Sequence, residues 1–250
     1  MKYSHPTVVA CALGFAVASG PARATDSSIY LLLPTVVKGE RELDWHAGVG
    51  SRGRNIAGED DAALGIGYGI TDGWFTEAAI RYRRDQGAPT TLDSIEWENI
   101  FMLAEPGEWP VDVGIVAEAE VPHATGEGAS LRVGPLMQRE FGRFQANFNL
   151  LASRYFRTAV YDATQFEYQG QFKLRYREPL EFGVQAFGNL ASGARSFAPA
   201  PQQMHRWGPA VLGRFVLPGE RAINYNAALL FGTTAGSPDR TFRVQVEYEF

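Results

Sequence analysis

Strand-like alternation repeats along almost the whole chain, and it limits the folds that this sequence can adopt. In twelve segments, apolar and polar residues alternate with period two or the composition is rich in residues typical of strands. Each segment has about ten residues, the length of a tilted transmembrane strand. No stretch keeps a convincing helical period. The predicted strands are 42–52, 61–70, 74–84, 92–103, 111–121, 129–140, 144–156, 165–177, 181–190, 205–216, 221–231 and 240–250.

The connections between these segments alternate in length. The even-numbered ones, such as "TDG", "FGR" and "PGE", are tight turns with Gly or Pro, and only "AEPGEWP" is intermediate. A soluble sandwich has no reason to sort its loops in this way. An outer-membrane barrel has short periplasmic turns, longer outer loops and an even number of strands. The longer, odd-numbered connections, which we expect outside the cell, contain Asn55, Pro89, His123, Tyr161, Ser196 and Ser237.

The last ten residues, "TFRVQVEYEF", alternate and finish on an aromatic residue. In a barrel this strand pairs with the first one, because an open edge in lipid leaves backbone groups without hydrogen bonds. Tyr248 and Phe250 then lie at the periplasmic interface, where aromatic rings are favourable. The stretch also resembles the C-terminal aromatic signal of bacterial outer-membrane barrels. That resemblance implies the barrel-assembly machinery as a partner.

The beginning of the chain is typical of an exported protein. Lys2 is followed by an apolar run over 8–18 and by the small-residue cleavage pattern Ala22-Arg23-Ala24. The apolar run is too short to span a bilayer, so we expect a signal peptide over 1–24 rather than an anchor. The remaining predicted units are a lead-in segment over 25–40 and a transmembrane barrel over 41–250. For the lead-in segment three roles stay open: a periplasmic tail, a plug that enters the lumen, or an extra strand.

Composition excludes several classes of protein. Loss of residues 1–24 removes two of the 23 basic side chains and none of the 28 acidic ones, so the mature chain carries a formal charge of −7. Nucleic-acid binding needs a basic face, so no nucleic acid is expected as a partner. Cys11 is the only cysteine and is lost with the signal peptide. Without disulfides, the exported chain needs an ordinary core or a closed hydrogen-bonded barrel.

Alternation also predicts which charged residues face the lumen. Acids concentrate in 92–103 and 111–121, and bases concentrate in 165–177 and 205–216, nearly opposite in a ring of twelve strands. Two interpretations stay open: a salt-bridged interior that blocks the barrel, and a polar pore. Barrels of eight strands are filled by side chains and barrels of sixteen strands hold a water channel, so a ring of twelve strands lies between these two cases. The bases of 165–177 lie nearer the periplasmic end than the acids do, which favours an open path. The candidate lumen-lining residues are Glu96, Glu98, Glu118, Glu120, Arg132, Lys173, Arg175, Arg177, Arg206 and Arg243.

Motifs for catalysis or cofactors are weak. "GVGSRG" matches a dinucleotide pattern but lacks the helix that should follow, so we interpret its glycines as small residues that crowd a neighbouring strand. The glycines of "GIGYG" should face the lumen and leave room for long side chains. His46 with Asp44 and Glu42 is the nearest approach to a metal cluster, but side chains two apart on one strand diverge. We find no Ser–His set, and we therefore expect no metal, no cofactor and no enzymatic activity.

A family resemblance covers most of the mature chain. "GYGITDGWFTEAAIRY", "IEWENIFMLAEPGEWPVDVGIVAEAE" and "QVEYEF" resemble uncharacterised proteobacterial outer-membrane barrels related to the MetA-pathway-of-phenol-degradation proteins. The resemblance implies transport of aromatic compounds and carries no site residues. The expected protein is an all-β, antiparallel up-and-down barrel in the bacterial outer membrane, in contact with lipid. Its expected function is passive transport of small polar or amphipathic solutes, with a blocked structural or partner-binding barrel second and an outer-membrane enzyme third.

Loop length predicts the topology in the membrane. Cysteines placed at Asn55, Pro89, His123, Tyr161, Ser196 and Ser237 should react with a membrane-impermeant thiol reagent on whole cells, because the longer loops face outward. Cysteines in the short turns, at Asp72, Gly142 and Gly219, should react only after the cells are opened. Labelling of the second set alone would reverse the predicted topology.

Overall fold

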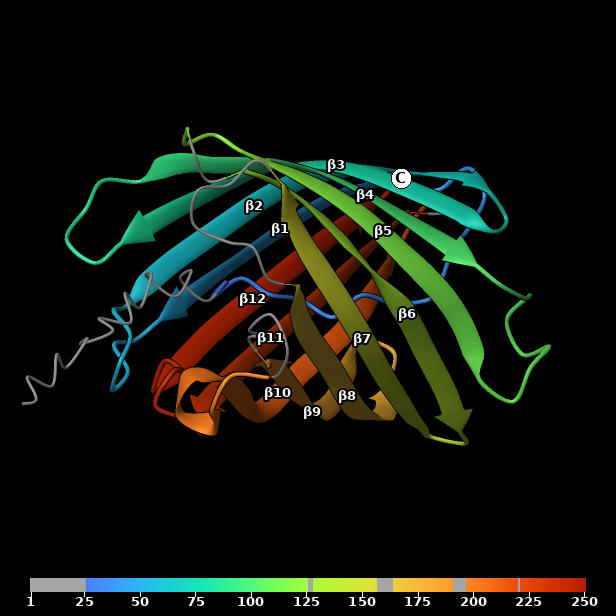
Figure 1. The fold of residues 1–250 in the computed structure, drawn as a ribbon. Helices are drawn as coiled ribbons and strands as arrows, with labels where there is room; N and C mark the ends of the chain where they lie inside the picture. Colours follow the sequence, from blue (N-terminus) through green and yellow to red (C-terminus); the bar gives the residue numbers. More distant parts are fainter. Residues whose placement is uncertain (1–25, 126–127, 157–163, 191–196, 220) are drawn as a thin grey trace, which may run out of the picture.

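The computed structural model describes residues 26–125, 128–156, 164–190, 197–219 and 221–250 (Figure 1). Within these ranges the chain forms twelve strands, and a short 3₁₀ helix, Ala200–Gln202, precedes β10. The predicted signal peptide, 1–24, and the loop positions Tyr161 and Ser196 lie outside the described residues. No helix in the described part of the chain is long and apolar enough to cross a bilayer.

The strands agree with the sequence prediction to within two residues at every boundary. The predicted fold class, an antiparallel up-and-down barrel, is confirmed, because each strand pairs antiparallel with its neighbours in the chain. The observed strands are β1 (Arg41–Gly50), β2 (Glu59–Thr71), β3 (Trp74–Asp85), β4 (Thr91–Met102), β5 (Asp112–Pro122), β6 (Ala129–Phe141), β7 (Phe144–Phe156), β8 (Gln165–Arg177), β9 (Leu180–Asn189), β10 (Met204–Leu217), β11 (Arg221–Gly232) and β12 (Arg240–Glu249).

The first and last strands close the ring. β12 pairs antiparallel with β1, from Glu42 opposite Glu249 to Gly50 opposite Thr241, and it pairs with β11 on its other side. The backbone N–H of Phe250 donates to the carbonyl of Arg41 at 2.9 Å, so pairing continues to the last residue. The sheet therefore has no free edge, as a barrel in lipid requires.

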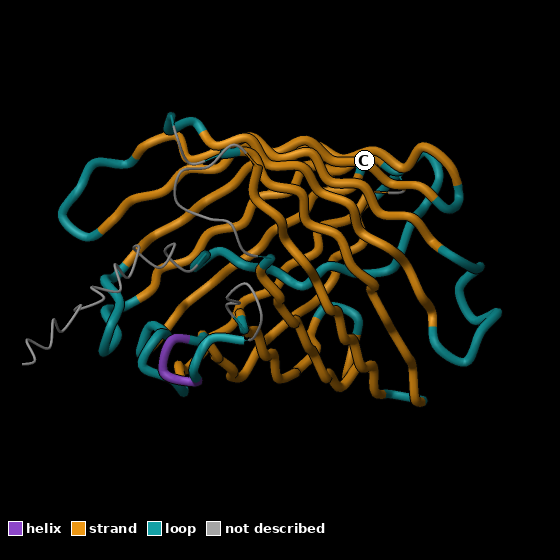
Figure 2. The backbone as a smooth tube through the Cα atoms, in the orientation of Figure 1, coloured by secondary structure: helices purple, strands orange, loops and turns teal. Residues whose placement is uncertain are grey.

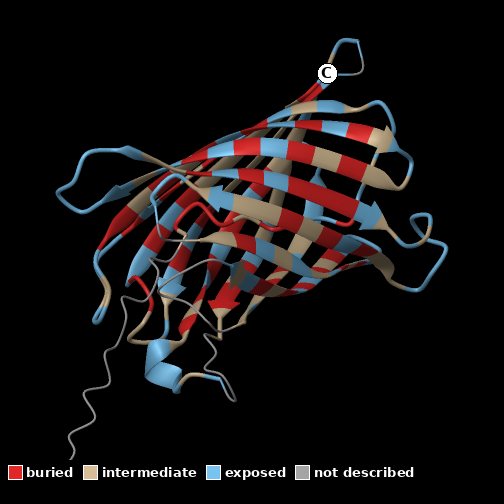
Figure 3. Cartoon of the chain, turned by 45° about the horizontal axis from the view of Figure 1, so that its top comes forward, coloured by how far each residue is buried: buried red, intermediate tan, exposed pale blue. Residues whose placement is uncertain are grey.

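The two faces of the barrel have opposite character. Large apolar side chains such as Trp45, Ile66 and Trp97 point outward and are 42%, 61% and 57% exposed. Buried and exposed residues alternate along the strands, which gives the banded pattern in Figure 3. The inward positions carry polar side chains, glycines and some apolar residues. An apolar exterior around a largely polar interior suits a barrel whose surroundings are lipid.

Residues 26–37, which we call the lumen segment, run through the inside of the barrel (Figure 2). At the end that carries the longer loops, the Ser27 hydroxyl donates to the carbonyl of Glu59 at 3.1 Å. At the end that carries the short turns, Gly39 N–H donates to the carbonyl of Gly69 at 2.8 Å. Gly39 has a φ of 82°, and the turn around it reverses the chain into β1. The lumen segment therefore lies where a plug would lie.

Two glycines on the barrel wall make room for the lumen segment. A Cβ at Gly48 would collide with the backbone of Ser27, and a Cβ at Gly69 would collide with the carbonyl of Val37. The expectation that "GVGSRG" crowds a neighbouring strand was therefore wrong for Gly48, which is crowded by the lumen segment instead. The expectation for "GIGYG" holds at Gly65 and Gly67, where a Cβ would meet the long inward side chains of Glu77, Phe75 and Glu42.

One of the proposed labelling positions has to be corrected. Ser237 is only 1% exposed, because its hydroxyl donates to the carbonyl of His205 at 3.0 Å and accepts from the His205 N–H at 2.9 Å. A cysteine at this position would be shielded from the reagent whichever side the loop faces. Asn55, Pro89 and His123 are exposed and remain suitable positions.

Closure by the last strand gives a test of assembly. Deletion of 248–250 removes the pairs that Tyr248 and Glu249 make with both β1 and β11. We expect a severalfold fall in folded protein, measured by heat-modifiable mobility on gels and by yield in the outer-membrane fraction.

Phe250→Ala is the milder variant, and Phe141→Ala is its matched control. Both phenylalanines are 47% exposed, and both lie at the short-turn end of the barrel. Only Phe250 extends the closing strand, through its backbone bond to Arg41, so only its replacement should lower the yield. Equal yields for the two variants and for the parent would contradict a special role of the C-terminal residue.

Candidate functional site

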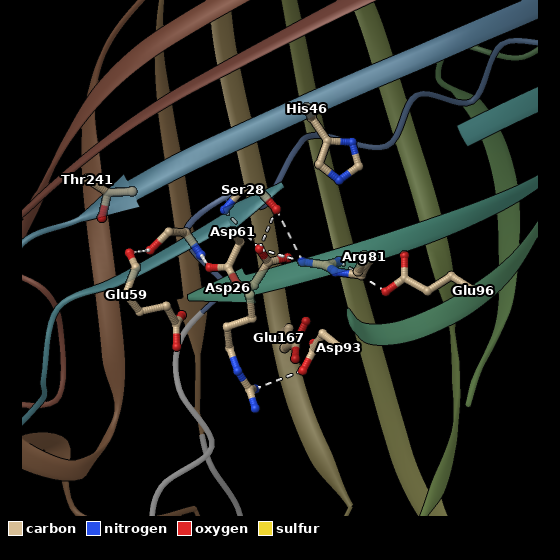
Figure 4. A network of polar contacts seen from close by, with 12 residues as sticks. Asp26, Ser28, His46, Glu59, Asp61, Arg81, Asp93, Glu96, Glu167 and Thr241 are labelled. Carbon is tan, nitrogen blue, oxygen red and sulfur yellow. Dashed lines mark hydrogen bonds and ion pairs between the residues drawn. The ribbon is translucent and has the colours of Figure 1, made fainter. Parts of the chain in front are cut away.

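The interior of the barrel is the candidate site. Near the end that carries the longer loops it contains a cluster of polar side chains (Figure 4). Arg81 of β3 lies between two carboxylates: one of its terminal nitrogens is 2.6 Å from Asp26 Oδ1, and the other is 3.0 Å from Glu96 Oε1. Arg81 also donates to the Ser28 hydroxyl at 3.2 Å. The Asp26 carboxylate in turn accepts from the Ser28 N–H at 2.9 Å. One buried arginine therefore joins the lumen segment to the wall.

The start of the lumen segment is also tied to other walls. Ser27 N–H donates to Asp61 Oδ2 of β2 at 2.8 Å. On β10, Arg206 donates to the backbone carbonyl of Asp26 and, at 3.2 Å, to Thr241 Oγ1 of β12. The segment thus bridges strands that lie far apart around the ring.

Apolar side chains hold the middle of the lumen segment. Leu32 and Ile29 are 2% and 8% exposed, and each packs against its own group of inward residues. These apolar positions interrupt a lumen that the charge pattern predicted as polar. The group around Leu32 is Phe75, Ile100, Val116, Leu136 and Leu151, and the group around Ile29 is Phe187, Ala210, Leu212, Ala228 and Leu230.

Side-chain amides bind the backbone of the lumen segment. Leu32 N–H donates to Gln169 Oε1 at 3.1 Å, and Asn149 Nδ2 donates to the Leu32 carbonyl at 2.8 Å. Sequence reasoning missed these residues because it weighed only charged ones, although the alternation in "FQANFN" and "YQGQ" places them inward. They belong to a wall of buried amides on β6 to β9, made of Gln138, Gln145, Asn147, Asn149, Gln169, Gln171 and Gln185.

Tyr30 contacts the opposite, acidic wall. Its hydroxyl donates to Glu98 Oε2 at 3.2 Å, and its ring lies 4.6 Å from the ring of His46. His46 faces the lumen, 1% exposed, with its Nδ1 3.0 Å from Asp44 Oδ2. Among the described residues, no three His, Cys, Asp or Glu side chains are grouped so as to hold a metal ion.

The predicted lumen acids have described partners nearby rather than among the bases of β8 and β10 on the other side of the barrel. Glu96 pairs with Arg81, and Glu118 accepts from Arg132. Glu98 contacts Tyr30, and Glu120 accepts from the Ser130 hydroxyl at 3.1 Å. Each of these contacts joins either two neighbouring strands or a strand and the lumen segment. The acids of β4 and β5 thus belong to a local network.

Apart from Arg132, which pairs with Glu118, the predicted lumen bases fall into two groups. Arg206 and Arg243 are 1% and 0% exposed inside the barrel, and Arg243 donates to Gln185 Oε1 at 2.7 Å. The bases of β8 lie at the short-turn end instead. Lys173 is 2.6 Å from Glu181 and Arg175 is 2.5 Å from Glu140, while the Arg177 guanidinium lies 5.2 Å from the Tyr176 ring centre. The described ion pairs of Lys173 and Arg175 are therefore made with acids at the short-turn end of the barrel, not with the acids of β4 and β5.

The turn between the lumen segment and β1 carries a titratable group. Partial burial and the neighbouring Glu249 carboxylate raise the pKa of Glu40 to about 7, although the positive charge of Arg214 acts in the opposite direction. Glu40 therefore changes charge near neutral pH at the position where the segment meets the barrel.

Comparison with known proteins supports the fold. No protein-family model and no curated protein matches the sequence. The NanC porin matches in structure with a TM-score of 0.53 and 10% identity, over 83% of this chain and 98% of that one. Omp33 of Acinetobacter baumannii (TM-score 0.48, 10% identity) covers 85% and 99%, and the NalP translocator domain of Neisseria meningitidis (0.49, 14%) covers 86% and 89%.

At these identities the likeness shows the fold alone. The chain has the fold of an outer-membrane β-barrel, as NanC does. The resemblance to phenol-degradation barrels stays a prediction.

The Arg81 network predicts a large effect on stability. Arg81→Met removes the partner of two carboxylates while keeping most of the apolar volume, so it should lower the free energy of unfolding by about 3 kcal/mol or more. Thermal and urea unfolding in detergent would measure the loss. Arg84→Gln is the control, because the Arg84 side chain is 55% exposed and exposed pairs contribute at most about 1 kcal/mol. Equal stability of both variants would contradict a structural role for the Arg81 network.

Proposed function

We propose that this protein is a passive channel of the bacterial outer membrane whose lumen is closed by its own lumen segment. The observation that carries the proposal is the course of residues 26–37 through the barrel. They contact the walls through hydrogen bonds and through Ile29 and Leu32, but they continue into β1 only through the turn at 38–40. Withdrawal of the segment toward the short-turn end therefore breaks no strand pair.

The walls themselves support a solute path. Once the segment leaves, the interior presents buried amides on β6 to β9 and acids on β3 to β5, with apolar groups between them. Such a surface suits small polar or amphipathic solutes. A ring of twelve strands is wider than the eight-stranded barrels that side chains fill completely. The family resemblance adds aromatic compounds to the solutes that merit testing, and NanC, a porin, has the same fold.

The proposed location of the channel is the outer membrane, and the outward side chains of the barrel support it. The apolar outward side chains contact lipid of the outer membrane, and the export signal over 1–24 directs the chain there. Tyr248 and Phe250, whose rings stack 5.5 Å apart at the short-turn end, are the proposed contact with the assembly machinery.

One observation favours the second candidate, a permanently blocked barrel with a structural or partner-binding role. The buried network of Asp26, Arg81 and Glu96, together with Arg206, anchors the segment where it begins. If those contacts never break, the lumen stays closed.

Conductance distinguishes the two functions. Single channels of the full mature chain in planar bilayers should be closed for most of the recording. A variant that lacks 26–37 should open steady pores, because the closing residues are gone while all twelve strands remain.

The control is a variant in which a Gly/Ser segment of the same length replaces 26–37. It keeps the length of the chain before β1 unchanged. It should conduct like the shortened variant, since it has no apolar anchors. Both variants must show the heat-modifiable mobility of a folded barrel. An impermeable shortened barrel that is correctly folded would exclude the channel and favour the blocked one.

A further inference from the structure

The site that holds Leu32 has the features of a binding site for peptides. We infer that, when the lumen segment leaves, this site binds a short peptide through one residue with a branched apolar side chain. The inference rests on the proposed function, because the site is free only in the open state. It goes further by naming a class of ligand that competes with the segment.

The first argument is that the wall binds both backbone hydrogen-bonding groups of a single residue. Gln169 Oε1 accepts from the N–H of Leu32, and Asn149 Nδ2 donates to its carbonyl. A donor and an acceptor placed to bind the N–H and C=O of one residue match a peptide backbone. A simple ion does not offer a donor and an acceptor together.

The second argument is that this pair of amides is held in place by the barrel. Asn149 of β7 lies directly opposite Gln169 of β8, and Asn149 Nδ2 also donates to Gln169 Oε1 at 2.8 Å. The two side chains are 0% and 1% exposed. Because strand pairing fixes both backbones, the geometry exists before a ligand arrives.

The third argument is an unused acceptor. Asn149 Oδ1 is buried without a hydrogen-bond partner in the described part of the chain. A buried polar atom of this kind costs free energy unless a donor reaches it. A ligand with one more N–H than Leu32 supplies can donate to this oxygen, so an external peptide can gain a contact that the lumen segment does not make.

The apolar group around Leu32 sets the side-chain preference. Val116 and Leu136 are 0% exposed, and Leu151 and Leu32 itself are 2% exposed. A glycine in place of leucine leaves this group without its partner. Apolar pockets discriminate about tenfold or more for each missing methylene in favourable cases. We therefore expect the site to bind leucine-containing peptides at least about tenfold more tightly than glycine analogues.

The experiment uses two synthetic heptapeptides and the barrel that lacks 26–37. The peptide SIYLLLP, which copies residues 28–34, should bind saturably in detergent by calorimetry and should block the open pore in bilayers. The peptide SIYLGLP, with glycine at the position of Leu32, should bind at least about tenfold more weakly. If the shortened barrel does not fold, the full chain with Leu32→Gly takes its place and must show the same preference.

Two variants of the wall test the amide contacts. Gln169→Leu and Asn149→Leu should each weaken binding of SIYLLLP severalfold. Gln145→Leu is the matched control: Gln145 is another buried inward amide of β7, but its described contact is with Glu140, and its replacement should leave binding unchanged.

The outcomes separate this inference from the proposed function. If the shortened barrel conducts but SIYLLLP does not bind, or binds no better than SIYLGLP, the peptide site is wrong and the channel stands. Binding that survives both amide replacements would also overturn the site. If the folded, shortened barrel never conducts, the channel is wrong, whatever the peptides do.

Discussion

Closure of the sheet on itself is the constraint on which the rest of the structure depends. In lipid a free strand edge leaves a row of backbone groups without hydrogen bonds, so the last strand must meet the first. The pairing of β1 with β12, extended by Phe250 N–H to Arg41, meets this requirement. Once the ring is closed, alternate side chains have only two destinations, lipid or lumen. The apolar exterior and the enclosed polar residues both follow from that division.

Enclosure then decides how the interior is stabilised. Charges inside a barrel cannot turn to bulk solvent, so Glu96 and Glu118 are matched by arginines on neighbouring strands. The lumen segment completes the interior, because it supplies Asp26 to Arg81 and apolar side chains to inward positions that would otherwise face water. The interior is therefore a core assembled around a piece of chain that belongs to no strand. Leu32, for example, belongs to one apolar cluster with inward residues of five strands, β3 to β7.

The sequence predicted the strands well because period-two alternation and turn chemistry are local properties. It predicted the lumen only in part. The inward position of Glu98 or Arg243 follows from alternation. Their partners, however, depend on which strands are neighbours and on how far along the barrel axis each residue lies. The contact between Leu32 and Gln169 joins positions 137 residues apart, and no local pattern contains it. The amides were overlooked for a different reason, since uncharged polar residues on a strand are equally typical of a solvent-facing surface.

The path of the lumen segment has a consequence for the order of folding. Asp26, in the lumen segment, meets Arg206, a residue 180 positions later in the chain. The segment's complete set of contacts exists only after β9, β10 and β11 have taken their places. Contacts between such distant positions form slowly, because a long loop must close before they contribute. Until then the apolar stretch "SIYLLLP" lacks these native contacts, and exposed apolar chain of this kind is prone to aggregation.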